Sequence, residues 1–376
     1  MKFVVSSIEL LSHLQTVNRV ISNKNTLPIL DNFLFSLKGN DLTITASDLE
    51  TTLITSISLD VVSQEGDIAV PAKILIDTLK NTPEQPLTFE VDPSNRQITI
   101  QSENGKYTIV GQNGEDFPSM PKIKEESKNS LNIESDAFLT GIEKTIFATA
   151  DDELRPVMNG VLFEQGEDGV TFVASDAHKL VRYRRNDITA AAKSSFILPK
   201  KPSSLLRTIL PKDDQPVNVE FDSQNVFFVL PNYRMVCRLV EGNYPAYNSV
   251  IPTNNQNKIT IDRLALLSAL KRVSVYSNQA SNLIKLSIDS DQMTVSAQDL
   301  DFSIAAKEHL SCQYDGAAME IGFKSLFLIE ILTNLSSSDV VLELSDPTRA
   351  GLILPAEKEN PNEDILMLLM PMMVNS

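Results

Sequence analysis

A threefold internal repeat is the feature that most constrains how this chain of 376 residues can fold. Three alternating segments end in the same way: LTITASDLE at 42–50, VTFVASDAH at 170–178 and MTVSAQDLD at 293–301. Their aspartates, Asp48, Asp176 and Asp299, are 128 and 123 residues apart. A period of this length is the size of a small domain, so the sequence predicts three copies of one folding unit.

Two further landmarks recur in the same order. A lysine opens the second helix of each unit, again with spacings of 128 and 123 residues: Lys73, Lys201 and Lys324. A proline closes each unit: Pro118, Pro245 and Pro371. Three landmarks in one order make chance similarity a poor explanation of the repeat.

Each unit alternates helical and strand patterns. Apolar residues at helical spacing predict helices over 7–21, 71–82, 136–148, 200–212, 261–275 and 323–335. Alternating segments between them, such as NFLFSL and LTITAS, predict strands. We therefore expect three α+β domains at 1–124, 125–256 and 257–376, with polar linkers near 122–129 and 252–258.

The distribution of charge bears on a nucleic-acid partner. The formal net charge is −16 and the pI is about 4.7, which by itself argues against DNA. The six expected helices nevertheless carry a net charge of +6, which leaves −22 for the rest of the chain. Helices turned toward a phosphate backbone could therefore bind DNA despite the acidic total. The alternative is that the basic helical residues are simply solvated on an outer surface.

Several protein classes fit the sequence poorly. The apolar runs are too short for a membrane helix, and the amino terminus reads as a strand followed by a helix instead of a signal peptide. The two cysteines, Cys237 and Cys312, predict neither a disulfide framework nor a metal site, so a reducing cytoplasm is the expected compartment. We expect no cofactor, no metal and no membrane partner.

The ordered motifs resemble a known family, the bacterial DNA polymerase sliding clamps, over the full length of the chain. The resemblance is carried by TLPIL at 26–30, MNGVLFE at 158–164, ASDAHKL at 174–180, EDFP at 115–118, NYPAYNSVIP at 243–252, MEIGF at 319–323 and MPM at 370–372. It implies three similar clamp domains per chain, each with outer antiparallel sheets and two inner helices. It further implies a head-to-tail, ring-shaped homodimer that encircles double-stranded DNA as a processivity factor, associated with the nucleoid.

The resemblance also implies which side chains meet DNA. These are Lys24, Lys73, Arg155, Lys200 and Lys201, acting on phosphates without reading sequence. For any one lysine, the alternative is an ordinary solvated charge. The chain departs from the family pattern at Asp152, Pro156 and Val157, beside Arg155.

A second implied site docks short peptides with aliphatic and aromatic anchors. The residues that would form this pocket are Met158, Ser175, Ala177, His178, Lys179, Leu180, Pro245, Val250, Leu368 and Met370. The implied partners are the polymerase alpha subunit, the clamp loader and other proteins with a clamp-binding motif. Ala177 and Lys179 stand where the family often has Gly and Arg. For Met158 and Leu180, an ordinary core position is the alternative.

The resemblance places the dimer contact at Tyr107 of one chain against Val275 and Tyr276 of the other, where buried strand positions are the alternative. Two other functions fit the sequence less well. An enzyme is disfavoured, because the three histidines lack metal-binding spacing and no nucleotide or nucleophile motif is present. A repeat-built scaffold that binds peptides but not DNA is the better rival.

Overall fold

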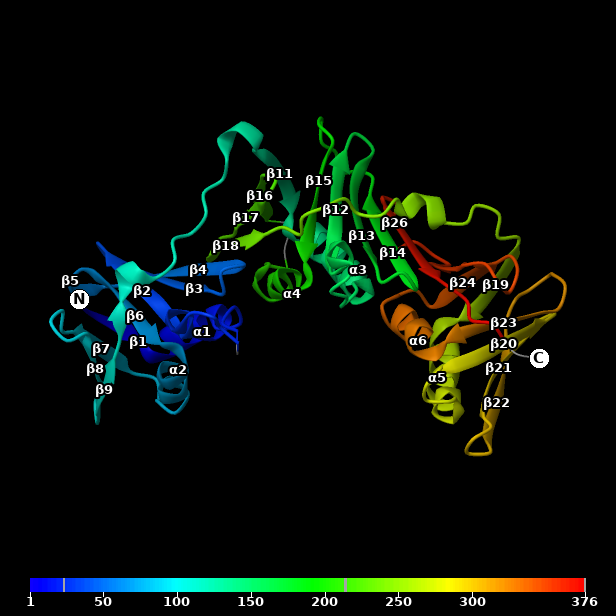
Figure 1. Cartoon of the computed structure of the whole chain (residues 1–376), viewed down its shortest axis with the longest axis horizontal. Coiled ribbons are helices and arrows are strands. Elements are labelled where there is room, and N and C mark those ends of the chain that lie inside the picture. Colours follow the sequence, from blue (N-terminus) through cyan, green and yellow to red (C-terminus); the bar gives the residue numbers. More distant parts are fainter. Residues whose placement is uncertain (23, 213–214, 375–376) are drawn as a thin grey trace. The chain divides into compact units, whose positions relative to one another are not determined.

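The structure is a computed structural model that describes residues 1–22, 24–212 and 215–374 (Figure 1). The chain divides into two compact units, one made of 1–136 and 204–239 and the other of 137–203 and 240–376. The expected central repeat therefore contributes to both units. The boundaries expected at 124/125 and 256/257 stay a prediction.

The first unit contains two antiparallel sheets. A five-stranded sheet has the order β5-β1-β7-β8-β9, and a nine-stranded sheet has the order β10-β6-β2-β3-β4-β18-β17-β16-β11. The strands are β1 (Lys2–Ser6), β2 (Asn32–Lys38), β3 (Asp41–Ser47), β4 (Thr51–Ser58), β5 (Val61–Gln64), β6 (Gly66–Pro71), β7 (Pro86–Val91), β8 (Gln97–Gln101), β9 (Lys106–Val110), β10 (Gln112–Asn113), β11 (Asn129–Glu134), β16 (Pro216–Phe221), β17 (Asn225–Val229) and β18 (Tyr233–Arg238). Helices α1 (Ser7–Val17) and α2 (Ala72–Lys80) lie side by side in this unit (Figure 1).

The second unit also contains two antiparallel sheets. Their orders are β15-β12-β13-β14-β26-β25-β24-β19 and β22-β21-β20-β23. The strands are β12 (Gly160–Gly166), β13 (Gly169–Ser175), β14 (Lys179–Arg185), β15 (Ser194–Pro199), β19 (Asn257–Asp262), β20 (Leu283–Asp289), β21 (Gln292–Asp299), β22 (Ile304–Ser311), β23 (Met319–Lys324), β24 (Asp339–Leu344), β25 (Gly351–Pro355) and β26 (Glu363–Leu369). Helices α5 (Arg263–Val273) and α6 (Ser325–Thr333) pack together, whereas α3 (Ser135–Thr145) and α4 (Lys200–Ile209) each begin in one unit and end in the other.

The six helices begin within two residues of the expected positions but end two to four residues earlier. After α3 and α5 the chain tightens into the 3-10 turns η4 (Ile146–Ala148) and η7 (Ser274–Tyr276), a common way for an α-helix to end. The expected charge segregation is therefore too large. The observed helices contain nine Lys and Arg against five Asp and Glu, a net charge of +4 instead of +6.

The repeated aspartates cap tight turns. Each carboxylate accepts backbone N–H groups two and three residues further on: Asp48 from Glu50 and Thr51, Asp176 from His178 and Lys179, and Asp299 from Asp301 and Phe302. The residues that follow the first two aspartates, Leu49 and Ala177, have φ of 75° and 73°. This landmark of the repeat is thus a structural requirement of the turn.

Sheets of neighbouring repeats join edge to edge in both units. In the first, β4 pairs with β18, from Thr51 opposite Cys237 to Thr55 opposite Tyr233. In the second, β14 pairs with β26, from Lys179 opposite Leu369 to Arg185 opposite Glu363. We call these two junctions the β4–β18 seam and the β14–β26 seam. No described helix is long and apolar enough to cross a membrane.

Candidate functional site

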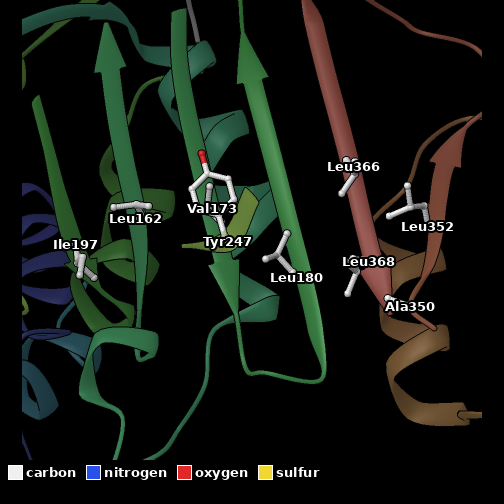
Figure 2. Packing of buried hydrophobic residues seen from close by; sticks show 9 residues of the cluster. All are labelled: Leu162, Val173, Leu180, Ile197, Tyr247, Ala350, Leu352, Leu366 and Leu368. Carbon is white, nitrogen blue, oxygen red and sulfur yellow. The ribbon is translucent and has the colours of Figure 1, made fainter. Parts of the chain in front are cut away.

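An apolar cluster covers one face of the eight-stranded sheet, on both sides of the β14–β26 seam (Figure 2). It comprises Leu162, Val173, Leu180, Ile197, Tyr247, Ala350, Leu352, Leu366 and Leu368. Side chains alternate along a strand, so the intervening residues Phe163, Phe172 and Tyr183 lie on the opposite face. There Phe163 and Phe172 pack against Phe138 of α3. The cluster therefore lies on the face turned away from α3.

A segment that we call the strap, residues 240–251, crosses this cluster. Val240, Tyr244 and Ile251 pack on the cluster as partly buried residues, and Tyr247 is a buried member of it. The Tyr247 hydroxyl donates a hydrogen bond of 2.6 Å to Glu164. Burial and this carboxylate together raise the pKa of Tyr247 to about 12. The strap is thus fixed to the sheet by apolar contact and by one hydrogen bond to a charged acceptor.

The strap and the sheet bring together many of the residues expected to form a peptide pocket. Leu180 and Leu368 face each other across the β14–β26 seam inside the cluster. The backbone N–H of Met370 donates to the carbonyl oxygen of His178 at 2.8 Å. Exposed at the surface are Ala177, His178, Pro245, Val250 and Met370. An apolar floor with exposed apolar and aromatic groups beside it suits a short amphipathic peptide.

Four of the expected pocket residues are buried for structural reasons. Leu180 and Leu368 are 3% exposed and belong to the cluster. Met158 is 7% exposed in the 3-10 turn η5 (Pro156–Met158), whose neighbouring Val157 packs on the cluster instead. Ser175 is buried, and its hydroxyl bonds the carbonyl oxygen of Lys179 at 2.9 Å. These four residues are therefore part of the core and would lie beneath the expected pocket instead of at its surface.

Lys179 is also buried, with 5% of its side chain exposed. Its ammonium lies 2.8 Å from Asp176 and 3.0 Å from Glu330 of α6. It also lies 4.3 Å from the centre of the Phe327 ring. Lys179 therefore fixes the turn that presents His178, and its charge is already matched by two carboxylates.

Sequence reasoning missed the contribution of α6. The His178 imidazole stacks on Phe327 with 5.8 Å between ring centres, and Lys324 places its ammonium 4.8 Å from the same ring. The aromatic residue three positions after the repeat lysine, in FKSLF, was the available signal, because it is unique to the third copy. Phe327 and Lys324 extend the candidate pocket beyond His178.

The five basic residues expected at DNA lie on exposed turns and helix starts. Lys24 follows α1, Lys73 is the second residue of α2, and Lys200 and Lys201 open α4. Lys73 pairs with Asp77 at 3.1 Å, yet 89% of its side chain is exposed. Arg155 pairs with Asp152 at 2.8 Å and holds the pKa of that carboxyl below its usual value. Arg155 thus has a local acidic partner that competes with a phosphate.

The residues expected at a dimer contact lie at free sheet edges or beside them. Tyr107 is 42% exposed on β9, which ends its sheet in the first unit. Val275 and Tyr276, in η7 of the second unit, are 73% and 41% exposed. Leu300 and Phe302, which precede the edge strand β22, and Ile304, its first residue, are exposed as well. Large exposed apolar groups beside an open strand edge are typical of surfaces that associate with another chain.

The described residues contain no group of three or more His, Cys, Asp and Glu side chains placed to hold a metal ion. Cys237 and Cys312 are buried, and burial raises the pKa of both thiols. The Asp176 carboxylate is bound to backbone N–H groups and to Lys179, so it does not orient the His178 ring as a catalytic carboxylate would.

Joined repeats of one folding unit with basic residues at the helix starts are the features of a clamp-type protein, and family comparisons support this class. The N-terminal, central and C-terminal domains of the DNA polymerase III beta subunit match residues 1–121, 132–246 and 248–373. The chain therefore belongs to the DNA polymerase III beta subunit family. Its function is that of a sliding clamp, the processivity factor of a DNA polymerase.

Individual relatives match this chain over nearly its whole length. The beta sliding clamp of Pseudomonas putida is 28% identical over 375 residues, which is 99% of this chain and 100% of the relative. That of Escherichia coli K12 is 27% identical and covers 96% of this chain and 97% of its own. The crystal structure of the Pseudomonas aeruginosa clamp matches with a TM-score of 0.93 at 26% identity, covering 100% of both chains. A Bartonella birtlesii clamp bound to griselimycin matches with a TM-score of 0.91 at 28% identity, also covering 100% of both chains.

Proposed function

We propose that two copies of the chain join head to tail into a closed ring around duplex DNA, and that the groove beside the strap docks peptides of replication proteins. The protein makes and breaks no bond in this role. It tethers the polymerase alpha subunit, the clamp loader and other proteins with a clamp-binding motif. The ring stays on DNA because it is closed, while weak phosphate contacts let it slide.

The observation that carries the ring is the repetition of the seams. In each seam, the strand that follows the Asp turn of one repeat pairs with the last strand of the next repeat: β4 with β18, and β14 with β26. The third repeat offers β22 at this position, and β22 is a sheet edge. The first repeat offers β9, its last strand apart from the two-residue β10, and β9 is also a sheet edge. The same edge-to-edge pairing between two chains places β22 of one chain beside β9 of the other. Two such pairings close the ring.

The existing seams also predict the register of this pairing. Leu53, five residues after Asp48, lies opposite Met235 in the β4–β18 seam. Ile304 stands five residues after Asp299, and Tyr107 occupies on β9 the place that Met235 has on β18. We therefore expect Ile304 of one chain opposite Tyr107 of the other.

Cysteine cross-linking tests this register. The double variant Tyr107→Cys, Ile304→Cys should form a covalent dimer on mild oxidation, because directly opposed strand residues are close enough for a disulfide. Each single variant should stay uncrosslinked, and the native cysteines are buried. The oxidised dimer should remain on circular duplex DNA at high salt and leave it when the DNA is linearised. Efficient cross-linking without retention on circles would instead favour the scaffold that binds peptides but not DNA.

The proposed DNA contacts are Lys24, Lys73, Arg155, Lys200 and Lys201. Substituting Lys73→Gln together with Lys201→Gln should weaken non-specific duplex binding and reduce the salt dependence of binding by about one phosphate contact per lysine. Lys358→Gln is the control, since this exposed lysine is not among the proposed contacts. Equal salt slopes for the wild type and the double variant would remove these lysines from the DNA surface.

Substitutions of exposed residues test the proposed groove best, because they should change the stability of the fold little. Met370→Ala and Val250→Ala remove side chains that are 41% and 56% exposed, so they should weaken peptide docking with little loss of stability. Leu180→Ala is expected to abolish docking too, but it also costs about 2–5 kcal/mol of stability because the residue is buried in the cluster. Unchanged peptide affinity of the Met370 and Val250 variants would refute the assignment.

A further inference from the structure

The three repeat lysines do not have the same surroundings. Lys73 is followed four residues later by Asp77 and pairs with it at 3.1 Å. Lys201 has Ser204 three residues later and Leu205 four residues later. Lys324 has Phe327 three residues later, and its ammonium lies 4.8 Å from the centre of that ring. An aromatic face attracts a cation, and the position of Phe327 is occupied by Ile76 and Ser204 in the first and second copies.

The ring that holds Lys324 belongs to the proposed groove. Phe327 stacks on His178, with 5.8 Å between ring centres and 23° between ring planes. The carbonyl oxygen of His178 accepts the backbone N–H of Met370 at 2.8 Å. Two residues further, Met372 donates its N–H to Gly322 at 2.8 Å, beside Lys324. The carboxyl-terminal segment thus runs from the His178 turn to β23, and Lys324 lies at that end of the groove.

The ammonium of Lys324 has no carboxylate in direct contact. The two carboxylates of this cluster, Asp176 and Glu330, are both bound by Lys179, at 2.8 and 3.0 Å. No described carboxylate lies within 4.0 Å of the Lys324 ammonium. Lys324 is half-buried, and it directly precedes α6, whose N-terminal end adds positive potential. The cluster of Lys179, Lys324, Asp176 and Glu330 is therefore neutral in total, and Lys324 is the one of its two cations that has no carboxylate in direct contact.

We infer that Lys324 makes the groove select partner peptides that carry an acidic side chain next to their apolar anchors. This inference rests on the proposed peptide docking. It assigns the third repeat lysine to partner choice, whereas Lys73 and Lys201 are proposed to face DNA. A charge at the edge of an apolar site adds modest affinity but a clear preference among partners, because the opposite charge is repelled.

Synthetic peptides with one leucine and one phenylalanine anchor, flanked by Glu, Gln or Lys, provide the test. Fluorescence anisotropy with the full-length protein should show the Glu peptide binding about twofold to fivefold more tightly than the Gln peptide, as expected for a partly exposed ion pair. The Lys peptide should bind more weakly than both. Raising the salt concentration should narrow these differences.

Two substitutions connect the preference to this side chain. Lys324→Gln should bind the Glu and Gln peptides equally, and Lys324→Glu should prefer the Lys peptide. The matched control, Lys358→Gln, removes an exposed lysine that faces Asp364 at 3.9 Å and should keep the preference for Glu. Equal binding of the Glu and Gln peptides by the wild type, or a preference that survives Lys324→Gln, would overturn the inference.

A DNA measurement separates the two possible roles of this lysine. Lys324→Gln should leave duplex affinity and its salt dependence unchanged, in contrast to Lys73→Gln. A loss as large as that of Lys73→Gln would show that Lys324 serves DNA, and the inference would fail. If the neutral Gln peptide does not bind the wild type at all, the proposed docking function itself is wrong, which is a different result from loss of selectivity.

Discussion

Lys179 of β14 and Glu330 of α6 form an ion pair with 3.0 Å between the ammonium nitrogen and the carboxylate oxygen. The two residues are 151 positions apart and belong to consecutive repeats. Asp176, in the turn before β14, binds the same ammonium at 2.8 Å. The turn that presents His178 is therefore anchored on a helix of the next repeat, at one end of the β14–β26 seam.

Removing the charge of Lys179 should lower the free energy of unfolding more than removing the charge of its partner Glu330. Lys179→Met deletes a cation that is 5% exposed and leaves the Asp176 carboxylate, 15% exposed, without it. We expect a loss of about 2–4 kcal/mol in the free energy of unfolding. Glu330→Gln should cost about 1 kcal/mol or less, because this partner is 47% exposed. Urea unfolding of both variants checks the order, and equal losses would contradict it.

The two residues with left-handed backbone after the repeated aspartates should tolerate glycine. Ala177→Gly and Leu49→Gly relieve strain at φ of 73° and 75°, partly offset by the greater freedom of the unfolded chain. We expect each to raise the free energy of unfolding by up to about 1 kcal/mol. Ala174→Gly, in the buried strand β13, is the control and should destabilise. Calorimetric midpoints below the wild type for both turn variants would argue against strain there.

Acidification should weaken the first unit through His13. This imidazole of α1 lies 2.6 Å from the Thr55 hydroxyl of β4, and burial lowers its pKa, with Glu9 opposing the effect. The unfolded chain therefore takes up the proton first as pH falls below about 6.5, so stability present above that pH is lost below it. The thermal midpoint should fall more between about pH 7.5 and pH 5.5 in the wild type than in His13→Gln. An equal fall in the wild type and in His13→Gln would contradict this prediction.

Gly141 of α3 should resist replacement by alanine. A Cβ at this position would meet the ring of Phe172, which is part of the aromatic packing beneath the sheet. The clash should outweigh the helix preference of alanine, which is worth about 1 kcal/mol. We expect Gly141→Ala to destabilise by about 1–2 kcal/mol in thermal or urea unfolding. Thr140→Ala, its neighbour on the same helix, should change the midpoint little, and a stabilised Gly141→Ala would show that the ring can move aside.

The parts of the structure that depend on local pattern were predictable. Helix starts follow from apolar spacing and from the repeat, so all six lie within two residues of expectation. The ends of α3 and α5 were overestimated because apolar spacing continues into the 3-10 turns η4 and η7. The strand character of the tail was also predictable, since ILMLL forms the second half of β26.

The parts that depend on distant partners were not predictable. Lys179 reads as an exposed pocket residue in sequence, because its partner Glu330 and its neighbour Phe327 lie on a helix of the next repeat. For Met158 and Leu180, the sequence leaves an ordinary core position as the alternative. Both side chains are in fact buried, with exposed fractions of 7% and 3%. The anchoring of Tyr247 by Glu164 likewise joins residues 83 positions apart. Resemblance to a family supplied Met158, Lys179 and Leu180 as expected pocket positions, but not the residues that surround them.

The open borders of β9 and β22 have a consequence for protein quality control. Each presents unsatisfied N–H and C=O groups together with exposed side chains such as Tyr107 and Ile304, the combination that promotes fibrous or amorphous self-association when no correct partner is bound. A solitary subunit would therefore be the vulnerable species in a cell. Pairing β9 of one chain with β22 of another would cover both exposed strand edges. Assembly of the dimer would therefore protect the protein from aggregation as well as enable its function.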